Sequence, residues 1–233
     1  MRKTNLQKGI ILICTAACIL FSCSTMDLAA RYPNMVADLD PFSVGTIDVL
    51  FDQLFTSKLK AHSVNVIFDP RENIVALEFR YELVRYRQFW DQKARQHFAM
   101  AFEQYKQDFN AKTLSTKYNK TRAVYGKTPG TVEWETFKYT STYKASPTLE
   151  LGYRFRQDAP YFAVLQRSAK EETGAMSGSD MDSQQITMYY TKALGEKLMA
   201  YFNQEYLREM AGVSNAPKIE EPAAAPDPDK DDY

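Results

Sequence analysis

A short apolar run near the N-terminus sets the first limit on what this chain can fold into. The run extends from Gly9 to Phe21, and Arg2, Lys3 and Lys8 precede it. A helix rises about 1.5 Å per residue, so this run covers only about 20 Å, whereas the apolar core of a bilayer is about 30 Å thick. The run is therefore too short to span a membrane. With its positive flank it predicts a secretory signal peptide.

The residues at the end of this run, Leu20-Phe21-Ser22-Cys23, resemble a bacterial lipobox, in which an aliphatic, a variable and a small residue precede a cysteine. The resemblance implies cleavage before Cys23 and attachment of a diacylglyceryl group, with its palmitate-type chains, to the thiol. Ser24 resembles the residue that follows the cysteine in lipoproteins sorted to the outer membrane of double-membrane bacteria. An ordinary signal peptide with an incidental cysteine is the alternative.

The cysteine count agrees with lipidation. The three cysteines are Cys14, Cys18 and Cys23, so cleavage would leave a single thiol in the mature chain. Exported proteins usually pair their cysteines as disulfides, and an acyl group on Cys23 would explain the unpaired one. Neither a disulfide nor a thiol nucleophile is then expected in the folded part.

Composition divides the chain into four parts. Hydrophobic residues make up 45% and charged residues 25% of the chain, as in globular proteins. We expect a signal peptide at 1–22, a flexible tether at 23–43, a single α+β domain at 44–212 and a disordered acidic tail rich in proline and alanine at 213–233. A domain of about 170 residues is large enough for one core.

Apolar periodicity predicts the element order α-ββ-α-ββββ-α. A first helix is expected from Thr46, because Ile47, Leu50, Phe51 and Leu54 have helical spacing. The alternating segments 64–68 and 75–81 flank a turn sequence and predict a hairpin. Long helices are expected at 87–111 and from Asp182 or Ser183 to about Gly212.

Three or four strands are expected between the two long helices. The candidate segments are 121–126, 132–143 with a bend near Thr136, 149–155 and 161–169, and residues 127–130 have a turn sequence. The sequence therefore predicts an α+β fold: an antiparallel sheet of about five to six strands packed against two long helices and one shorter N-terminal helix.

Motifs for metal and serine chemistry are weak. Histidine occurs only at His62 and His97, and neither has another histidine at metal-ligand spacing, so no metal or other cofactor is expected. Ser57 and Lys60 match the S-x-x-K pattern of penicillin-recognising enzymes. The companion elements of that pattern are incomplete and occur in the wrong order along the chain. No catalytic residue is assigned.

A carboxylate pair is the remaining catalytic candidate. Glu133 and Glu135 flank Trp134 in a predicted strand, so their side chains point the same way and are separated by about 6.6 Å of backbone rise. Carboxylates at such distances serve glycoside hydrolysis. A half-buried strand with Trp134 inside and both glutamates in water gives the same pattern, and we favour that interpretation.

One basic segment is a candidate surface for an anionic partner such as a polysaccharide, a lipid head group or an acidic protein. Tyr118 and Tyr125 lie within this segment, whose cations are Lys112, Lys117, Lys120, Arg122 and Lys127. A solvated connection between elements is the alternative interpretation.

These features predict an exported envelope lipoprotein, held by the lipid on Cys23 and sorted to the outer membrane. Its domain is expected to be a non-enzymatic module that binds an envelope protein, a glycan or a lipid. Nucleic acid is not expected as a partner, because the chain has no net charge. The alternative is an envelope hydrolase with a Ser, Asp or Glu site that residue spacing does not reveal.

Overall fold

The computed structural model describes residues 28–53, 58–136, 142–173 and 182–213. The chain divides into two compact units, Met1–Asn34 and Met35–Tyr233. In the first unit the described residues include a one-turn helix, α2 (Leu28–Arg31), and the guanidinium carbon of Arg31 lies 5.3 Å from the centre of the Tyr32 ring. Cys23 and the acidic tail beyond Val213 lie outside the described residues.

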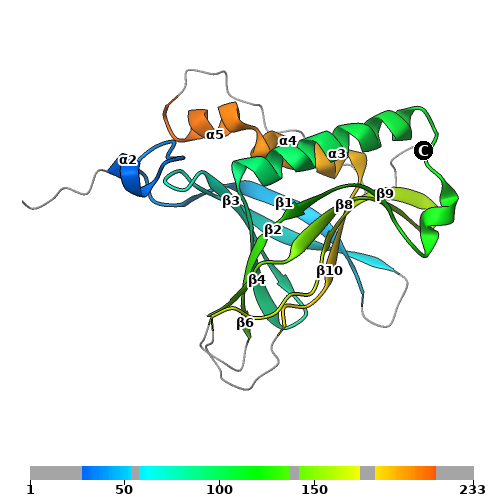
Figure 1. The fold of residues 1–233 in the computed structure, drawn as a ribbon. Coiled ribbons are helices and arrows are strands. Elements are labelled where there is room, and N and C mark those ends of the chain that lie inside the picture. Colours follow the sequence, from blue (N-terminus) through cyan, green and yellow to red (C-terminus); the bar gives the residue numbers. More distant parts are fainter. Residues whose placement is uncertain (1–27, 54–57, 137–141, 174–181, 214–233) are drawn as a thin grey trace, which may run out of the picture. The chain divides into compact units, whose positions relative to one another are not determined.

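The second unit is built on one ten-stranded antiparallel sheet that curves into a half-barrel (Figure 1). Its strands are β1 (Phe42–Asp52), β2 (Leu59–Asp69), β3 (Ile74–Tyr81), β4 (Val84–Trp90), β5 (Ala123–Pro129), β6 (Thr131–Thr136), β7 (Thr142–Ala145), β8 (Thr148–Arg156), β9 (Ala159–Gln166) and β10 (Ile186–Tyr190). Their spatial order is β5-β8-β9-β10-β1-β2-β3-β4-β6-β7, which places β5 and β7 at the two edges.

One bent hairpin contributes to both ends of the sheet. Strands β5 and β6 follow each other with only Gly130 between them, and β7 and β8 run back alongside. β6 pairs with β4 and β8 pairs with β9, which are far apart in the strand order. The amide of Gln88 on β4 donates to Gln166 on β9 at 2.9 Å, and both side chains are buried. Side chains of these distant strands therefore meet in the interior of the half-barrel.

Helices α3 (Gln92–Asn110) and α4 (Lys192–Phe202) pack on the inner face through aromatic rings. The ring centres of Phe98 and Phe102 lie 5.3 and 5.2 Å from that of Phe162 on β9. The two helices approach closely, because a Cβ on Gly195 of α4 would lie 2.2 Å from the ring of Phe102. The remaining helices are α5 (Gln204–Met210) and the short 3₁₀ helix η1 (Thr116–Asn119).

The predicted fold class was wrong, because the unit is mostly sheet rather than five or six strands against two long helices. The expected helix at Thr46 is strand β1. Its helical spacing arises at the end of β1: Ile47, Val49 and Phe51 are buried on one face, and Leu50 is also buried on the opposite face, where Thr46 and Asp48 are exposed. A strand buried on both faces loses its simple alternation. Leu54 lies outside the described residues.

Both long helices were predicted to begin too early. Residues 84–90 form β4, and α3 starts only after Asp91, whose carboxylate accepts from the amide of Ala94 at 2.7 Å. Residues 186–190 form β10, and α4 starts after Thr191, whose hydroxyl accepts from the amide of Leu194 at 3.2 Å. In each case a strand with large apolar residues leads directly into a helix, so the apolar pattern continues across the boundary.

The remaining local predictions had mixed outcomes. The hairpin of residues 64–81 is present as β2 and β3, and Gly212 has a φ of 73° just after α5. The expected turn at 127–130 was wrong, because β5 continues to Pro129. The single strand expected at 132–143 is two paired strands, β6 and β7.

Candidate functional site

A groove of about 660 Å³ lies between α3 and the edge strand β5. We call it the α3–β5 groove. Four residues of α3 line one wall and four residues of β5 line the other: His97, Met100, Ala101 and Gln104, and Val124, Tyr125, Gly126 and Lys127. Its volume falls in the range of about 300–1,000 Å³ that is usual for ligand sites.

The groove runs along an open sheet edge. β5 pairs with β8 on one side, and the described residues place no strand on its other side. The opposite edge, β7, is covered, since Glu172 donates its amide to the carbonyl of Lys144 at 2.8 Å and accepts from Ser146. An open strand edge presents backbone donors and acceptors that can pair with another chain. The groove therefore offers main-chain hydrogen bonds on its β5 wall.

The walls also carry exposed apolar side chains. Met100 on α3 is 64% exposed and Val124 on β5 is 44% exposed. A β-bulge lies between Val124 and Gly126, and a Cβ on Gly126 would meet no atom within 4 Å. The buried Nδ1 atom of His97 has no hydrogen-bond partner among the described residues. The groove is thus open at Gly126 and has exposed apolar side chains on both walls.

Asp108 of α3 holds the Tyr125 side chain at one end of the groove. Its hydroxyl donates to Asp108 at 2.7 Å, and Asp108 also accepts from Gln104 at 3.1 Å. The ring centre of Tyr125 lies 5.7 Å from that of Tyr153 on β8. Burial, and then the bond to Asp108, raises the pKa of Tyr125 well above its ordinary value, so the phenol stays protonated.

The opposite rim is basic. Three cations converge on the buried carboxylate of Glu150: Arg122 at 2.8 Å, Arg167 at 3.0 Å and Lys127 at 3.1 Å. Burial would raise the pKa of Glu150, but hydrogen bonds from these three cations outweigh it and hold the pKa at about 2. One carboxylate cannot neutralise three cations, so this cluster, which we call the Glu150 rim, has surplus positive charge.

The structure brings together two of the five predicted basic residues. Arg122 and Lys127 meet at Glu150, whereas Lys117 lies over the ring of Tyr118, 4.9 Å from its centre. Lys112 and Lys120 are exposed in the connection around η1. Sequence reasoning missed Glu150 and Arg167, because they join the cluster only through the pairing of β5, β8 and β9.

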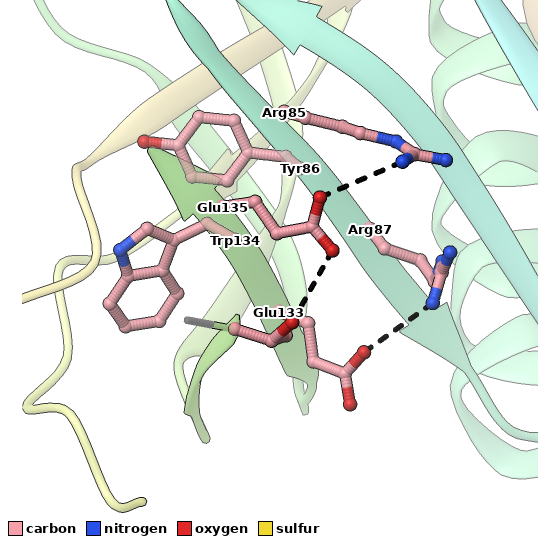
Figure 2. A pocket seen from close by; sticks show the side chains of 7 residues that line it. Arg85, Tyr86, Arg87, Glu133, Trp134 and Glu135 are labelled. Atoms are coloured by element: carbon pink, nitrogen blue, oxygen red, sulfur yellow. Dashed lines mark hydrogen bonds and ion pairs between the residues drawn. The ribbon is translucent and has the colours of Figure 1, made fainter. Parts of the chain in front are cut away.

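The carboxylates of Glu133 and Glu135 belong to a charge ladder on the outer face of the sheet (Figure 2). Glu133 lies 3.6 Å from Arg87 and Glu135 lies 3.6 Å from Arg85, across the β4–β6 pair. Trp134 points to the buried face. The hollow between these residues is only about 10 Å³, too small for a substrate. The arrangement fits the two-faced strand that the sequence favoured.

Two further features bear on the kind of site. Among the described residues, no group of three or more histidine, cysteine, aspartate or glutamate side chains is arranged to hold a metal ion. No helix in the described ranges has both the length and the apolar character needed to cross a bilayer. Ser57 of the S-x-x-K match lies outside the described residues.

Comparison with known protein families shows the family of this chain. A model described as "Uncharacterised Treponema protein" matches residues 43–209, from β1 to α5. The chain belongs to this family. The matched region of the Treponema family contains both walls of the α3–β5 groove and the Glu150 rim.

A Treponema pallidum (strain Nichols) protein described as "Uncharacterized protein" is similar to this member of the Treponema family. The two are 24% identical over 165 residues, which cover 70% of this chain and 55% of the relative. The chain thus spans little more than half the length of that relative. No solved structure matches the chain.

Proposed function

We propose that this member of the Treponema family is an exported envelope lipoprotein, anchored in the outer membrane by lipid on Cys23, whose second unit binds a partner without catalysing a reaction. The observation that carries the binding role is the α3–β5 groove, which combines a free strand edge with exposed apolar walls. The lipobox resemblance at residues 20–23 supports the anchor.

The groove chemistry favours binding over hydrolysis. Its β5 wall offers backbone hydrogen bonds, and both walls offer apolar side chains. A hydrolase needs a nucleophile or acid held within hydrogen-bond reach of a base. The phenol of Tyr125 donates to Asp108, but burial and that bond raise its pKa well above the ordinary value, so it stays protonated and is a poor nucleophile. Nδ1 of His97 has no hydrogen-bond partner in the described part of the chain, so no base activates it.

The anchor is tested by metabolic labelling with a clickable fatty acid. Wild-type protein should carry the label and Cys23→Ser should not, because serine cannot accept the thioether-linked lipid. Cys14→Ser is the matched control and should label like the wild type, since Cys14 precedes the cleavage site. Label on Cys23→Ser, or none on the wild type, would contradict the anchor.

The binding role is tested by photo-crosslinking in intact cells. A photoreactive phenylalanine is placed at Val124 on the groove wall or, as the control, at Leu83, which is 83% exposed in the β3–β4 turn. We expect a discrete crosslinked species from Val124 alone. Equal products from both positions, or none from Val124, would contradict binding at the groove.

A further inference from the structure

We propose that the partner of the α3–β5 groove is an extended polypeptide segment with acidic side chains, which adds to β5 as an antiparallel or parallel strand. This inference rests on the proposed function, and it specifies the chemical class of the partner. It follows from three properties of the same surface: a free strand edge, apolar walls and a basic rim.

The free edge selects a polypeptide. Only another polypeptide backbone presents amide donors and carbonyl acceptors at the spacing of a strand, which is about 3.3 Å per residue. Extended peptides bind such edges in several kinds of domain, with main-chain hydrogen bonds supplying affinity and pockets beside the edge supplying specificity. A glycan or a lipid could fill the groove but would leave these backbone groups without matched partners.

The walls select alternate apolar side chains. Successive side chains of a strand point to opposite faces, so every second residue of an added strand would face α3. There it would meet Met100, which is 64% exposed, and Ala101. Val124, which is 44% exposed, lies on the opposite wall. The apolar content of the groove therefore fits a segment with alternating apolar residues.

The Glu150 rim selects acidic residues. Lys127 lines the groove, and its side chain is 61% exposed although its amine contacts Glu150. Arg167, 48% exposed, contacts the same carboxylate. Since Glu150 is surrounded by three cations, a second carboxylate can bind Lys127 and Arg167 without displacing it. The carboxylate of Asp108, at the other end of the groove, already accepts from Tyr125 and Gln104. The cations of the Glu150 rim should therefore determine the charge of the partner.

Four octapeptides test this chemistry against the full chain, purified in detergent, by fluorescence anisotropy. The first alternates valine with glutamate or threonine. The second has lysine in place of glutamate. The third and fourth are copies of the first, N-methylated either at every valine or at every other residue, so that each lacks the amide donors of one strand edge.

We expect the acidic peptide to bind, and the lysine peptide to bind at least about fivefold more weakly, with the difference shrinking at high salt. Only one N-methylated peptide should lose affinity, by about tenfold or more, because only one edge of an added strand faces β5. The proposal is overturned if all four peptides bind equally, if both methylated peptides bind like their parent, or if the acidic peptide does not bind.

Variants locate the binding. Gly126→Trp should weaken the acidic peptide by about tenfold, since the new side chain enters the groove where no atom lies within 4 Å of the Cβ. Leu83→Trp adds the same side chain in the β3–β4 turn and should leave affinity unchanged. Lys127→Gln should reduce the preference for glutamate over lysine. Equal effects of the two tryptophans would place the peptide elsewhere and overturn the proposal.

Two outcomes separate this inference from its alternatives. Tighter peptide binding after removal of residues 217–233, which include Glu220, Glu221, Asp227, Asp229, Asp231 and Asp232, would assign the groove to the chain's own tail and overturn a separate partner. A crosslinked product at Val124 without any peptide preference would overturn the acidic-strand partner while leaving the proposed function intact. If Val124 gives no crosslinked product and the peptides show no preference, both proposals are contradicted.

Discussion

At the scale of single residues, two glycines of the second unit have opposite surroundings. A Cβ on Gly195 would lie 2.2 Å from the buried ring of Phe102, whereas a Cβ on Gly126 would meet no atom within 4 Å. Gly195 therefore permits the close approach of α4 to α3. Gly126 leaves the groove open and is not required by packing.

Gly195→Ala should destabilise the protein even though alanine favours helices by about 1 kcal/mol over glycine. Overpacking of a full core costs about 1–3 kcal/mol, and Phe102 is completely buried and cannot move aside. Urea unfolding should show a lower midpoint for this variant. Gly126→Ala is the control and should unfold at or above the wild-type midpoint. A more stable Gly195→Ala would contradict the packing described for α3 and α4.

Glu150 should make stability depend on pH in acid. Its folded-state pKa of about 2 lies below the ordinary 4.5, so its contribution is complete above about pH 4.5 and is lost as pH falls toward 2. The loss is of the order of 2–3 kcal/mol. Glu150→Gln should therefore show a shallower decline in unfolding free energy between pH 5 and 2 than the wild type, as followed by urea titrations. Parallel curves for the two proteins would contradict this role.

At the scale of elements, the sequence predicted local features better than boundaries. The β2–β3 hairpin and the end of α5 are encoded by a turn sequence and a glycine, which act locally. β1 and β10 were mistaken for helix because each also buries a residue on its second face, Leu50 and Tyr189, which pair with each other, so neither strand shows simple alternation. Their burial depends on partners that are distant in the sequence, and periodicity cannot reveal it.

The start of α3 is fixed by Asp91, which separates it from β4. Its carboxylate accepts the amide of Ala94 at 2.7 Å, as in an N-cap. Asp91→Ala should lower the unfolding free energy by about 1 kcal/mol. Asp91→Asn should keep most of the stabilisation that the N-cap provides, because asparagine also accepts from the amide. Thermal unfolding of the two variants would measure the difference. If both matched the wild type, the cap would not stabilise this helix.

The candidate site was only partly predictable for the same reason. The density of basic residues indicated Arg122 and Lys127, which are close in sequence. Glu150 and Arg167 join them through strand pairing, and α3 meets β5 only in the folded unit. Whether β5 has an open edge is a property of the strand order, which no local pattern in the sequence encodes.

At the scale of the sheet as a whole, one buried polar chain joins strands from distant places in the strand order. Trp90 donates to Gln88, Gln88 donates to Gln166, and Gln166 donates to the carbonyl of Gln184, at 2.9, 2.9 and 3.2 Å. Gln88 and Gln166 are fully buried. The chain therefore links β4 with β9 and with the segment that enters β10.

Gln166→Leu should cost about 1–3 kcal/mol, because it leaves the buried amide of Gln88 without its acceptor. In a double-mutant cycle, Gln88→Leu with Gln166→Leu should cost less than the sum of the single changes. Gln96→Leu, an exposed position on α3, is the control and should change stability little. Strict additivity in urea unfolding would contradict a direct link between the two amides.

The central claim is that β5 is an open edge on which a partner strand forms, and amide hydrogen exchange tests it most directly. In the free protein, alternate β5 amides that are not bonded to β8 should exchange fast, whereas those of the interior strand β10 should be protected. The acidic octapeptide should slow exchange at β5 by about tenfold or more and leave β7 unchanged. Slow exchange throughout β5 in the free protein, or protection that the peptide does not change, would contradict the claim.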